Sequence, residues 1–246
     1  PPRSTLFPYT TLFRSRRCIE MCGRYALYGP RSRIRDRFDL DDGFDFGPRY
    51  NIAPTTNVLV VRPGPNGRRV GSLYRWGLIP GWAKDGTLGA KLSNARGETV
   101  SEKPAFRAAF RRWRCIVPAS GFFEWKAVQE DGRTVKQPYF IRPRDENELF
   151  GFAGLSERWV SPDGEEIHSC CIITTDANAL MMPIHDRMPV ILAPGDYDAW
   201  LDPANVNAEM LRAFLCPAEA DDMIAYPVSR AVNSSRTDAP MLVEPA

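Results

Sequence analysis

Residues 114–142 read RCIVPASGFFEWKAVQEDGRTVKQPYFIR, and this stretch decides the class of fold. Its β-branched and aromatic residues predict two strands, over 114–127 and 135–142. The dipeptide Asp131-Gly132 lies between them and is typical of the tight turn of a β-hairpin. Similar patterns predict further strands at 23–28, 57–62, 70–76, 149–155, 167–175 and 222–228.

The helices that the sequence predicts are short. Phe106, Ala109, Phe110 and Trp113 follow the spacing of one helix face. Other helices are expected at 31–38, 176–182 and 196–216. Because strands and helices do not alternate regularly, the sequence predicts an α+β fold with a curled, mostly antiparallel β-sheet and short peripheral helices. We expect one domain over residues 22–246.

Composition narrows the classes of protein. Of 246 residues, 43% are hydrophobic and 25% charged, as in globular proteins, and no long apolar run predicts a membrane span. We expect residues 1–21 to be a non-native or disordered leader, with Met21 as the initiator. Without them, 28 basic and 29 acidic side chains remain, a net charge of −1, so total charge does not indicate nucleic-acid binding.

Six cysteines show no CxxC pair and no zinc-ligand spacing. We therefore expect reduced thiols, a cytoplasmic protein, and neither a metal nor another cofactor. Cys22 is the candidate nucleophile among them. Removal of Met21 would leave it with a free α-amine beside its thiol, and these two nucleophiles can close a five-membered thiazolidine ring on an aldehyde. The alternative is a small buried cysteine at the start of a strand.

Three further positions could carry chemistry. Asn94 precedes an expected helix start, so it either caps that helix or orients a substrate group. Glu124 lies in a strand between Phe123 and Trp125, and alternation sends it to the opposite face. There it is either a solvent-facing carboxylate or a general acid/base in an aromatic pocket. His185 lies in a proline-flanked loop, where it either catalyses or fixes the loop.

Candidate binding residues accompany these positions. An arginine lies two residues after each of Cys22, Asn94 and His185. These are Arg24, Arg96 and Arg187, and they are either phosphate-binding arginines or members of ordinary ion pairs. Three tryptophans, Trp76, Trp82 and Trp125, could stack on unpaired bases or belong to the core. The second histidine, His168, is assigned to structure.

Seven motifs occur in a fixed order along the chain. They are Met-Cys-Gly-Arg at 21–24, Asn-Ile-Ala-Pro at 51–54, Trp-Gly-Leu-Ile-Pro at 76–80, Ser-Asn-Ala-Arg at 93–96, Gly-Phe-Phe-Glu-Trp at 121–125, Ile-His-Asp-Arg-Met-Pro at 184–189 and Pro-Val-Ser-Arg at 227–230. This order resembles the SOS-response-associated peptidase (SRAP) family, whose members crosslink to abasic sites in single-stranded DNA. The resemblance covers residues 21–242 and implies a barrel-like fold.

The resemblance also implies roles for single residues. It makes Cys22, Asn94, Glu124 and His185 catalytic, with Cys22 forming the thiazolidine. It assigns DNA contacts to Arg24, Arg96, Arg187, Trp82 and Pro54. The family often carries a second bulky aromatic residue after the tryptophan, where this chain has Ala83, which weakens the expected stacking.

The partner implied is single-stranded DNA with abasic sites, at junctions or stalled forks, bound by a monomer that associates with the nucleoid. A thiol peptidase using Cys22, His185 and Asn94 is the alternative, with autoproteolytic removal of the leader as an accessory activity. A non-catalytic module that binds single-stranded DNA is the third hypothesis, and high salt would fully reverse such a complex.

Overall fold

The computed structural model describes residues 23–41, 43–45, 47–65 and 67–246. Regular elements follow one another along these residues as the sequence patterns predict in most places. The strands are β1 (Arg24–Leu27), β2 (Arg49–Ile52), β3 (Asn57–Pro63), β4 (Arg69–Trp76), β5 (Asn94–Arg96), β6 (Arg114–Ala119), β7 (Gly121–Glu130), β8 (Arg133–Pro143), β9 (Phe150–Val160), β10 (Glu166–Asp176), β11 (Arg187–Pro189), β12 (Ile191–Leu192) and β13 (Met223–Pro227). The helices are α1 (Arg31–Phe38), α2 (Arg107–Arg112), α3 (Tyr197–Leu201) and α4 (Ala208–Arg212), with short 3₁₀ turns at Gly86–Lys91, Pro194–Asp196, Ala220–Asp222, Arg230–Asn233 and Pro240–Val243.

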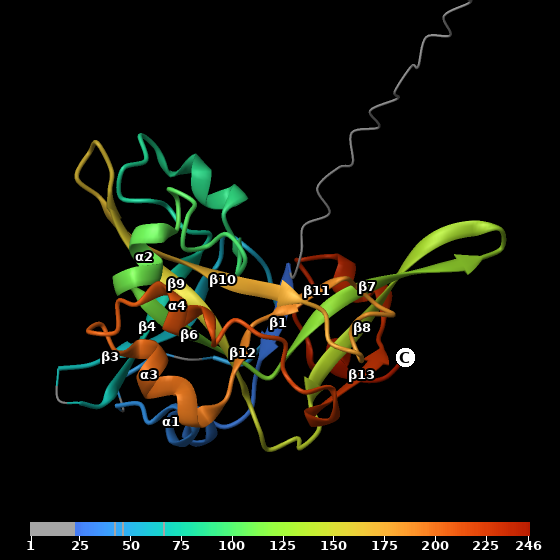
Figure 1. Ribbon diagram of the computed structural model, residues 1–246. Coiled ribbons are helices and arrows are strands. Elements are labelled where there is room, and N and C mark those ends of the chain that lie inside the picture. The colour runs from blue at the N-terminus through green and yellow to red at the C-terminus, as the bar shows by residue number, and fades with distance from the viewer. Residues whose placement is uncertain (1–22, 42, 46, 66) are drawn as a thin grey trace, which may run out of the picture.

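Five strands close into a barrel. The order β10-β4-β3-β6-β9 is hydrogen-bonded throughout, and β9 pairs again with β10, so the first and last strands meet. All of these pairs are antiparallel except β10 with β4. Closure leaves these strands without a free long edge. The predicted α+β fold with a curled, mostly antiparallel sheet is confirmed (Figure 1).

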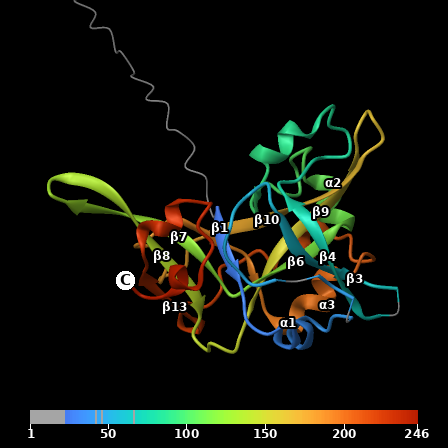
Figure 2. The same ribbon diagram turned by 180° about the vertical axis from the view of Figure 1, so that it is seen from behind.

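A second sheet, ordered β13-β8-β7-β1-β2, lies beside the barrel. Its long hairpin of β7 and β8 projects away from the barrel in both views (Figures 1 and 2). The hairpin turns at Asp131 and Gly132, where φ is 49° and 74°. Positive φ at both central residues is the geometry of a type I′ turn, so the predicted hairpin is confirmed.

The chain passes from the barrel to the second sheet at Ser120. The strand predicted over 114–127 is in fact two strands, because β6 pairs with β9 and β3 whereas β7 pairs with β8 and β1. Ser120 holds the crossing: its N–H donates to the carbonyl of Ala26, and its Oγ accepts the N–H of Tyr28 at 3.0 Å. One continuous stretch therefore joins the two sheets.

Two other predictions were wrong. No helix forms over 176–182, where the carbonyl and side-chain oxygens of Asn178 accept the N–H of Met181 in a local turn. The helix expected over 196–216 is two short helices, α3 and α4. Pro203 falls between them, and the side chain of Asn207 caps the second. The Asn178 side chain competes with helical hydrogen bonds in the first segment, and Pro203 lacks the N–H needed to continue a helix in the second.

Apolar side chains fill two main cores. The larger core lies in and around the barrel and includes Tyr25, Trp76 and Phe152. The smaller core covers the far face of the second sheet and joins Phe123 and Phe140 to the C-terminal segment. None of the helices in the described residues is long and apolar enough to cross a membrane.

Gly154 offers a test of barrel closure, because it pairs with both Cys115 on β6 and Ile172 on β10. A Cβ there would lie 2.9 Å from the sulfur of Cys115 and 3.1 Å from the carbonyl oxygen of Cys171. We expect Gly154→Ala to lower the free energy of unfolding by about 1–3 kcal/mol in denaturant titrations. Gly195→Ala is the control, since a Cβ there meets nothing within 4 Å. Equal stability of the two variants would contradict tight closure.

Candidate functional site

Trp76 brings three of the sequence motifs together. Its ring, 1% exposed, meets the ring of Tyr25 edge-on with centroids 5.3 Å apart. Its indole N–H donates to the carbonyl oxygen of Ser93 at 2.9 Å. Its backbone exchanges hydrogen bonds with Thr55 and Thr56, in the turn that follows Asn-Ile-Ala-Pro. The start of β1, this turn and the residue before β5 therefore all contact Trp76, through its side chain or its backbone.

The carboxyl end of β10 positions a second set of residues. Strand β5 runs parallel to β10, with Arg96 opposite Thr174 and Asn94 two residues earlier. Strand β11 pairs antiparallel with the same end, where Arg187 lies opposite Asp176. In Figure 1, β10 runs from the barrel toward β11 and β1. Asn94, Arg96 and the His185 loop thus meet at the same end of β10.

Asn94 does not cap a helix. It begins strand β5, and the residues after it form hydrogen-bonded turns before α2 begins at Arg107. A strand residue paired with β10 has the wrong backbone conformation for a helix N-cap, which removes that alternative. The half-buried amide at this position is consistent with the orienting role, which stays a prediction.

Glu124 is buried, with 2% of its surface exposed, so the solvent-facing alternative is wrong. Strand alternation holds as predicted: Phe123 lies in the smaller core and Trp125 packs against it. Glu124 points to the other face, together with Phe122 of the larger core. Its position follows Phe123, which pairs with Arg24 at the start of β1.

His185 is held in one orientation. Its side chain is 13% exposed, and its Nδ1 accepts the backbone N–H of Arg187 at 3.0 Å. The same nitrogen lies 3.2 Å from Asp186, but it cannot donate to that carboxylate while it accepts from Arg187. We assign the bond to Arg187, because Asp186 is 84% exposed and water solvates its carboxylate. The neutral ring then carries its proton on Nε2.

Arg187 is an ion-paired arginine. Its Nη1 donates to Glu98 and to Asp176, and its Nη2 donates to Glu98 at 3.0 Å and to the carbonyl of Thr174 at 2.9 Å. Burial would lower its pKa, but the two carboxylates outweigh burial and raise the pKa. The pKa of Glu98 is lowered in turn: partial burial opposes the shift, but the hydrogen bond from Arg187, a backbone hydrogen bond and the charges of Arg187 and Arg96 together outweigh it.

Arg96 differs from Arg187 in being exposed. It lines a cavity of about 640 Å³ together with Arg187, Glu98, Asp176, Met182, Thr99 and Asp186. Since Arg187 already neutralises two of these carboxylates, Arg96 is the basic side chain here that can turn to solvent. This cavity is large enough for a nucleotide-sized group.

Arg24 lies on the other face of the second sheet from Glu124. Its Nη1 donates to the side-chain oxygen of Asn51 at 3.1 Å and to the carbonyl of Val232 at 3.0 Å. Asn51 is itself buried and donates to the carbonyls of Val232, Ser234 and Thr237. The motif Asn-Ile-Ala-Pro thereby ties Arg24 to the segment after β13.

Two predicted DNA-contact residues lie in turns. Trp82 is 62% exposed, although most tryptophans in the described chain are at least partly covered. Its neighbour Ala83 is buried against Ile79 and Trp159, and its carbonyl accepts the indole N–H of Trp159. A bulky residue would not fit at position 83 here. Pro54 is half-buried in the turn beside Trp76.

Cys22 lies outside the described residues. Of the cysteines that the structure describes, Cys115, Cys170 and Cys171 are buried, and burial raises the pKa of each thiol. Such thiols are poor nucleophiles, because the thiolate is the reactive form. Cys216 is exposed. Among the described residues no group of three or more His, Cys, Asp or Glu side chains is arranged to hold a metal.

Sequence reasoning missed the residues that hold the site in shape. Glu98 and Asp176 fix Arg187, and Asn51 fixes Arg24. Asn51 stood in a quoted motif, and Glu98 follows Arg96 by two residues, so both were visible. Asp176 had no signal, because only the pairing of β10 with β11 brings it to Arg187.

Comparisons with known proteins give one consistent result. The SOS response associated peptidase (SRAP) family matches residues 21–235. The abasic site processing protein YoqW of Bacillus subtilis (strain 168) is 46% identical, over 91% of this chain and 99% of that protein. The abasic site processing protein HMCES of Rattus norvegicus is 30% identical, over 92% of this chain and 76% of that protein. A crystal structure of a protein from Bacteroides thetaiotaomicron is 29% identical with a TM-score of 0.80, covering 92% of this chain and all of that one.

The pairing of Glu98 with Arg187 predicts a pH-dependent stability. Because the pKa of Glu98 is lowered from its ordinary 4.5, its contribution is present above that pH and is lost as the pH falls through the lower value. We expect Glu98→Gln to destabilise by about 1 kcal/mol at pH 7, with the difference from the unsubstituted protein closing near about pH 3. Thermal unfolding at both pH values measures it, with Glu102→Gln as control. A difference that does not change with pH would contradict the charge pairing.

Proposed function

The chain belongs to the SOS response associated peptidase family, and on that premise we propose that it processes abasic sites in single-stranded DNA by linking covalently to them through Cys22. Relatives at 46% and 30% identity carry the name abasic site processing protein. The observation that carries the proposal is the gathering of the SRAP motifs around Trp76 and the end of β10. These contacts join residues as far apart in the sequence as Asn94 and Ile172, as a composite site requires.

The covalent step uses both nucleophiles of an N-terminal cysteine. Only the open form of an abasic sugar has an aldehyde. The α-amine of Cys22 adds to the aldehyde carbon, and loss of one water gives an imine. The thiol sulfur then adds to the imine carbon while its proton moves to the nitrogen, which closes a thiazolidine. An amide nitrogen cannot do this, because its lone pair is delocalised into the carbonyl. The active form must therefore begin at Cys22.

Glu124 is proposed as the group that moves protons during imine formation. It is buried, and it lies one position past the residue that pairs with Arg24, where β1 begins. Loss of water from the carbinolamine needs a proton donor, and the amine needs a proton acceptor. A carboxyl group held out of bulk water can serve both steps.

His185 and Asn94 are proposed to act on the sugar. The Nε2–H of His185 can donate to the ring oxygen as the closed sugar opens, because Nδ1 is held by Arg187. Asn94 lies on the neighbouring strand β5 and can hold the opened sugar in a reactive pose. The fixed orientation of the imidazole supports this division of roles.

DNA contacts are proposed for Arg24, Arg96, Trp82 and Pro54. The exposed indole of Trp82 offers a face for an unpaired base, and Arg96 offers an exposed positive charge for a phosphate. For Arg187 the ion pairs with Glu98 and Asp176 favour a positioning role, since its terminal nitrogens already donate to four acceptors. A direct contact between Arg187 and a phosphate stays a prediction, which the salt dependence of DNA binding by an Arg187 variant tests.

A thiol peptidase is the second candidate, favoured by the family's description as a peptidase. Cys22 would be its nucleophile, His185 its base and Asn94 the orienting residue. This chemistry needs the thiol alone, so it survives a blocked α-amine. Autoproteolysis before Cys22 would expose its α-amine, so the peptidase activity would precede crosslinking.

Replacing Glu124 tests the proton-transfer role. We expect Glu124→Gln to slow formation of the denaturation-resistant adduct by about 10²–10⁴-fold, because the amide keeps the shape but cannot exchange protons. Affinity for an undamaged single strand should stay unchanged. The control is Glu157→Gln, which replaces a half-buried carboxyl group whose pKa is raised by burial. An unchanged rate in Glu124→Gln would show that this carboxyl has no part in the reaction.

The two arginines at the end of β10 should respond differently to salt. Arg96→Ala should weaken binding of damaged and undamaged single strands alike and flatten the slope of log affinity against log salt by about 0.7. Arg187→Ala should lower protein stability and adduct yield while it leaves that slope unchanged. Fluorescence anisotropy at several salt concentrations measures both. Equal flattening by Arg187→Ala would assign it to a phosphate instead.

A further inference from the structure

The segment before and within α2 carries an uncompensated row of basic side chains. Residues 103–123 contain no aspartate or glutamate, yet they include Lys103, Arg107, Arg111 and Arg112. All four side chains are exposed. Among the ion pairs of the described residues none involves these four, whereas Arg158, Arg212 and Arg230 are each paired with a carboxylate. Like charges left together in this way repel one another, so another contribution must favour them.

Fold stability explains only part of the row. Arg111 and Arg112 lie in the last turn of α2, where a positive charge interacts favourably with the helix dipole. This does not apply to Lys103 and Arg107, which precede or begin the helix. Arg114 shows what a structural arginine looks like here: it is buried and donates to backbone carbonyls, including that of Trp200.

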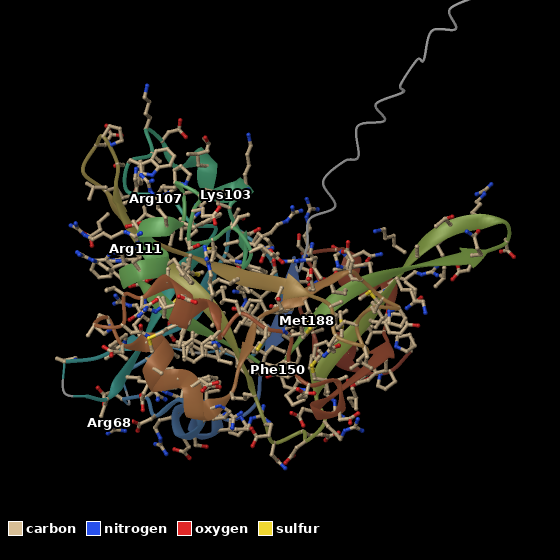
Figure 3. All side chains as sticks on the ribbon, viewed as in Figure 1. Arg68, Lys103, Arg107, Arg111, Phe150 and Met188 are labelled. Carbon is tan, nitrogen blue, oxygen red and sulfur yellow. The ribbon has the colours of Figure 1, made fainter. Side chains whose placement is uncertain are left out.

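The row is continuous with the candidate site. Backbone hydrogen bonds form a chain of turns that leads away from Arg96. The N–H of Thr99 donates to the carbonyl of Arg96, the N–H of Lys103 donates to the carbonyl of Thr99, and the N–H of Arg107 donates to the carbonyl of Lys103. Arg111 follows one helical turn later. Steps of four residues advance about 6 Å and keep side chains on neighbouring faces. Figure 3 shows Lys103, Arg107 and Arg111 following one another around α2, away from Met188 on β11.

We propose that Lys103, Arg107 and Arg111 bind the phosphates of the single strand that leaves the reactive site. The proposal rests on the proposed function, because it extends the DNA path beyond Arg96. A single strand, rather than a duplex, is favoured by an exposed aromatic side chain at the far end of the row. Trp113, directly after Arg112, is 53% exposed. Unpaired bases stack on such surfaces, whereas the bases of a duplex are already stacked.

The test uses undamaged single strands of two lengths, about five and about fifteen nucleotides. We expect Arg107→Gln/Arg111→Gln to weaken binding of the longer strand roughly tenfold at about 0.1 M salt and to flatten its salt slope by about 1.4, since two phosphate contacts are lost. Binding of the shorter strand should change little. Arg107→Lys/Arg111→Lys keeps the charges and should retain the slope.

The matched control is Arg133→Gln/Lys136→Gln, which removes two exposed charges from the β7–β8 hairpin on the other side of the molecule (Figure 1). Equal weakening by control and test variants would overturn the proposal, because only total charge would then matter. The same variants are also measured with DNA whose flanking segment is double-stranded. Weaker binding of that DNA alone, with unchanged binding of the long single strand, would overturn the single-strand assignment.

Adduct yield separates the two proposals. A short abasic strand does not reach the row, so both variants should crosslink it as the unsubstituted protein does. If no protein forms an adduct while the salt slopes still differ, the proposed function fails and the row remains a DNA surface. If adducts form normally and the test variant has the same salt slope as the unsubstituted protein, the proposed function stands and only the proposal for the basic row fails.

Discussion

Pairing along β10 is the constraint on which both the barrel and the site depend. Its first half bonds to β9 and closes the barrel, and its second half bonds to β5 and β11. Because the same strand does both, hydrogen bonds to a strand of the barrel position the residues at its carboxyl end. Trp76 connects this region to β1 through its ring contact with Tyr25 and to the start of β5 through its hydrogen bond to Ser93. Sites supported by packed strands keep the geometry that a reaction of several steps needs.

Burial divides the charged side chains of this region into an enclosed group and an exposed group. Glu124 is enclosed, and the guanidinium of Arg187 is surrounded by Glu98 and Asp176. Arg96 and the row from Lys103 to Arg111 remain exposed, so their positive potential can reach a strand outside the protein. The overall composition hid this division, since 28 basic and 29 acidic side chains over residues 22–246 nearly cancel. Local placement, not net charge, makes the surface suitable for DNA.

Much of the fold could be predicted from patterns that act locally. The hairpin at Asp131-Gly132 and the alternation that turns Glu124 away from Phe123 both depend on neighbours in sequence, and both were confirmed. Errors arose where tertiary pairing overrides local preference. Asn94 looked like a helix cap, but β10 recruits it into a strand. The strand over 114–127 divides at Ser120 because its halves find partners in different sheets. Asp176 could not be linked to Arg187 without the fold.

The central claim is a covalent bond made by both nucleophiles of Cys22, and intact mass after denaturation tests it most directly. Protein that begins at Cys22 is incubated with an abasic single strand, in parallel with the same protein acetylated at its α-amine and with Cys22→Ser. The account predicts a mass equal to protein plus DNA less one water, resistant to heat, only for the free N-terminal cysteine. An equal yield of heat-stable adduct from the acetylated protein would contradict it.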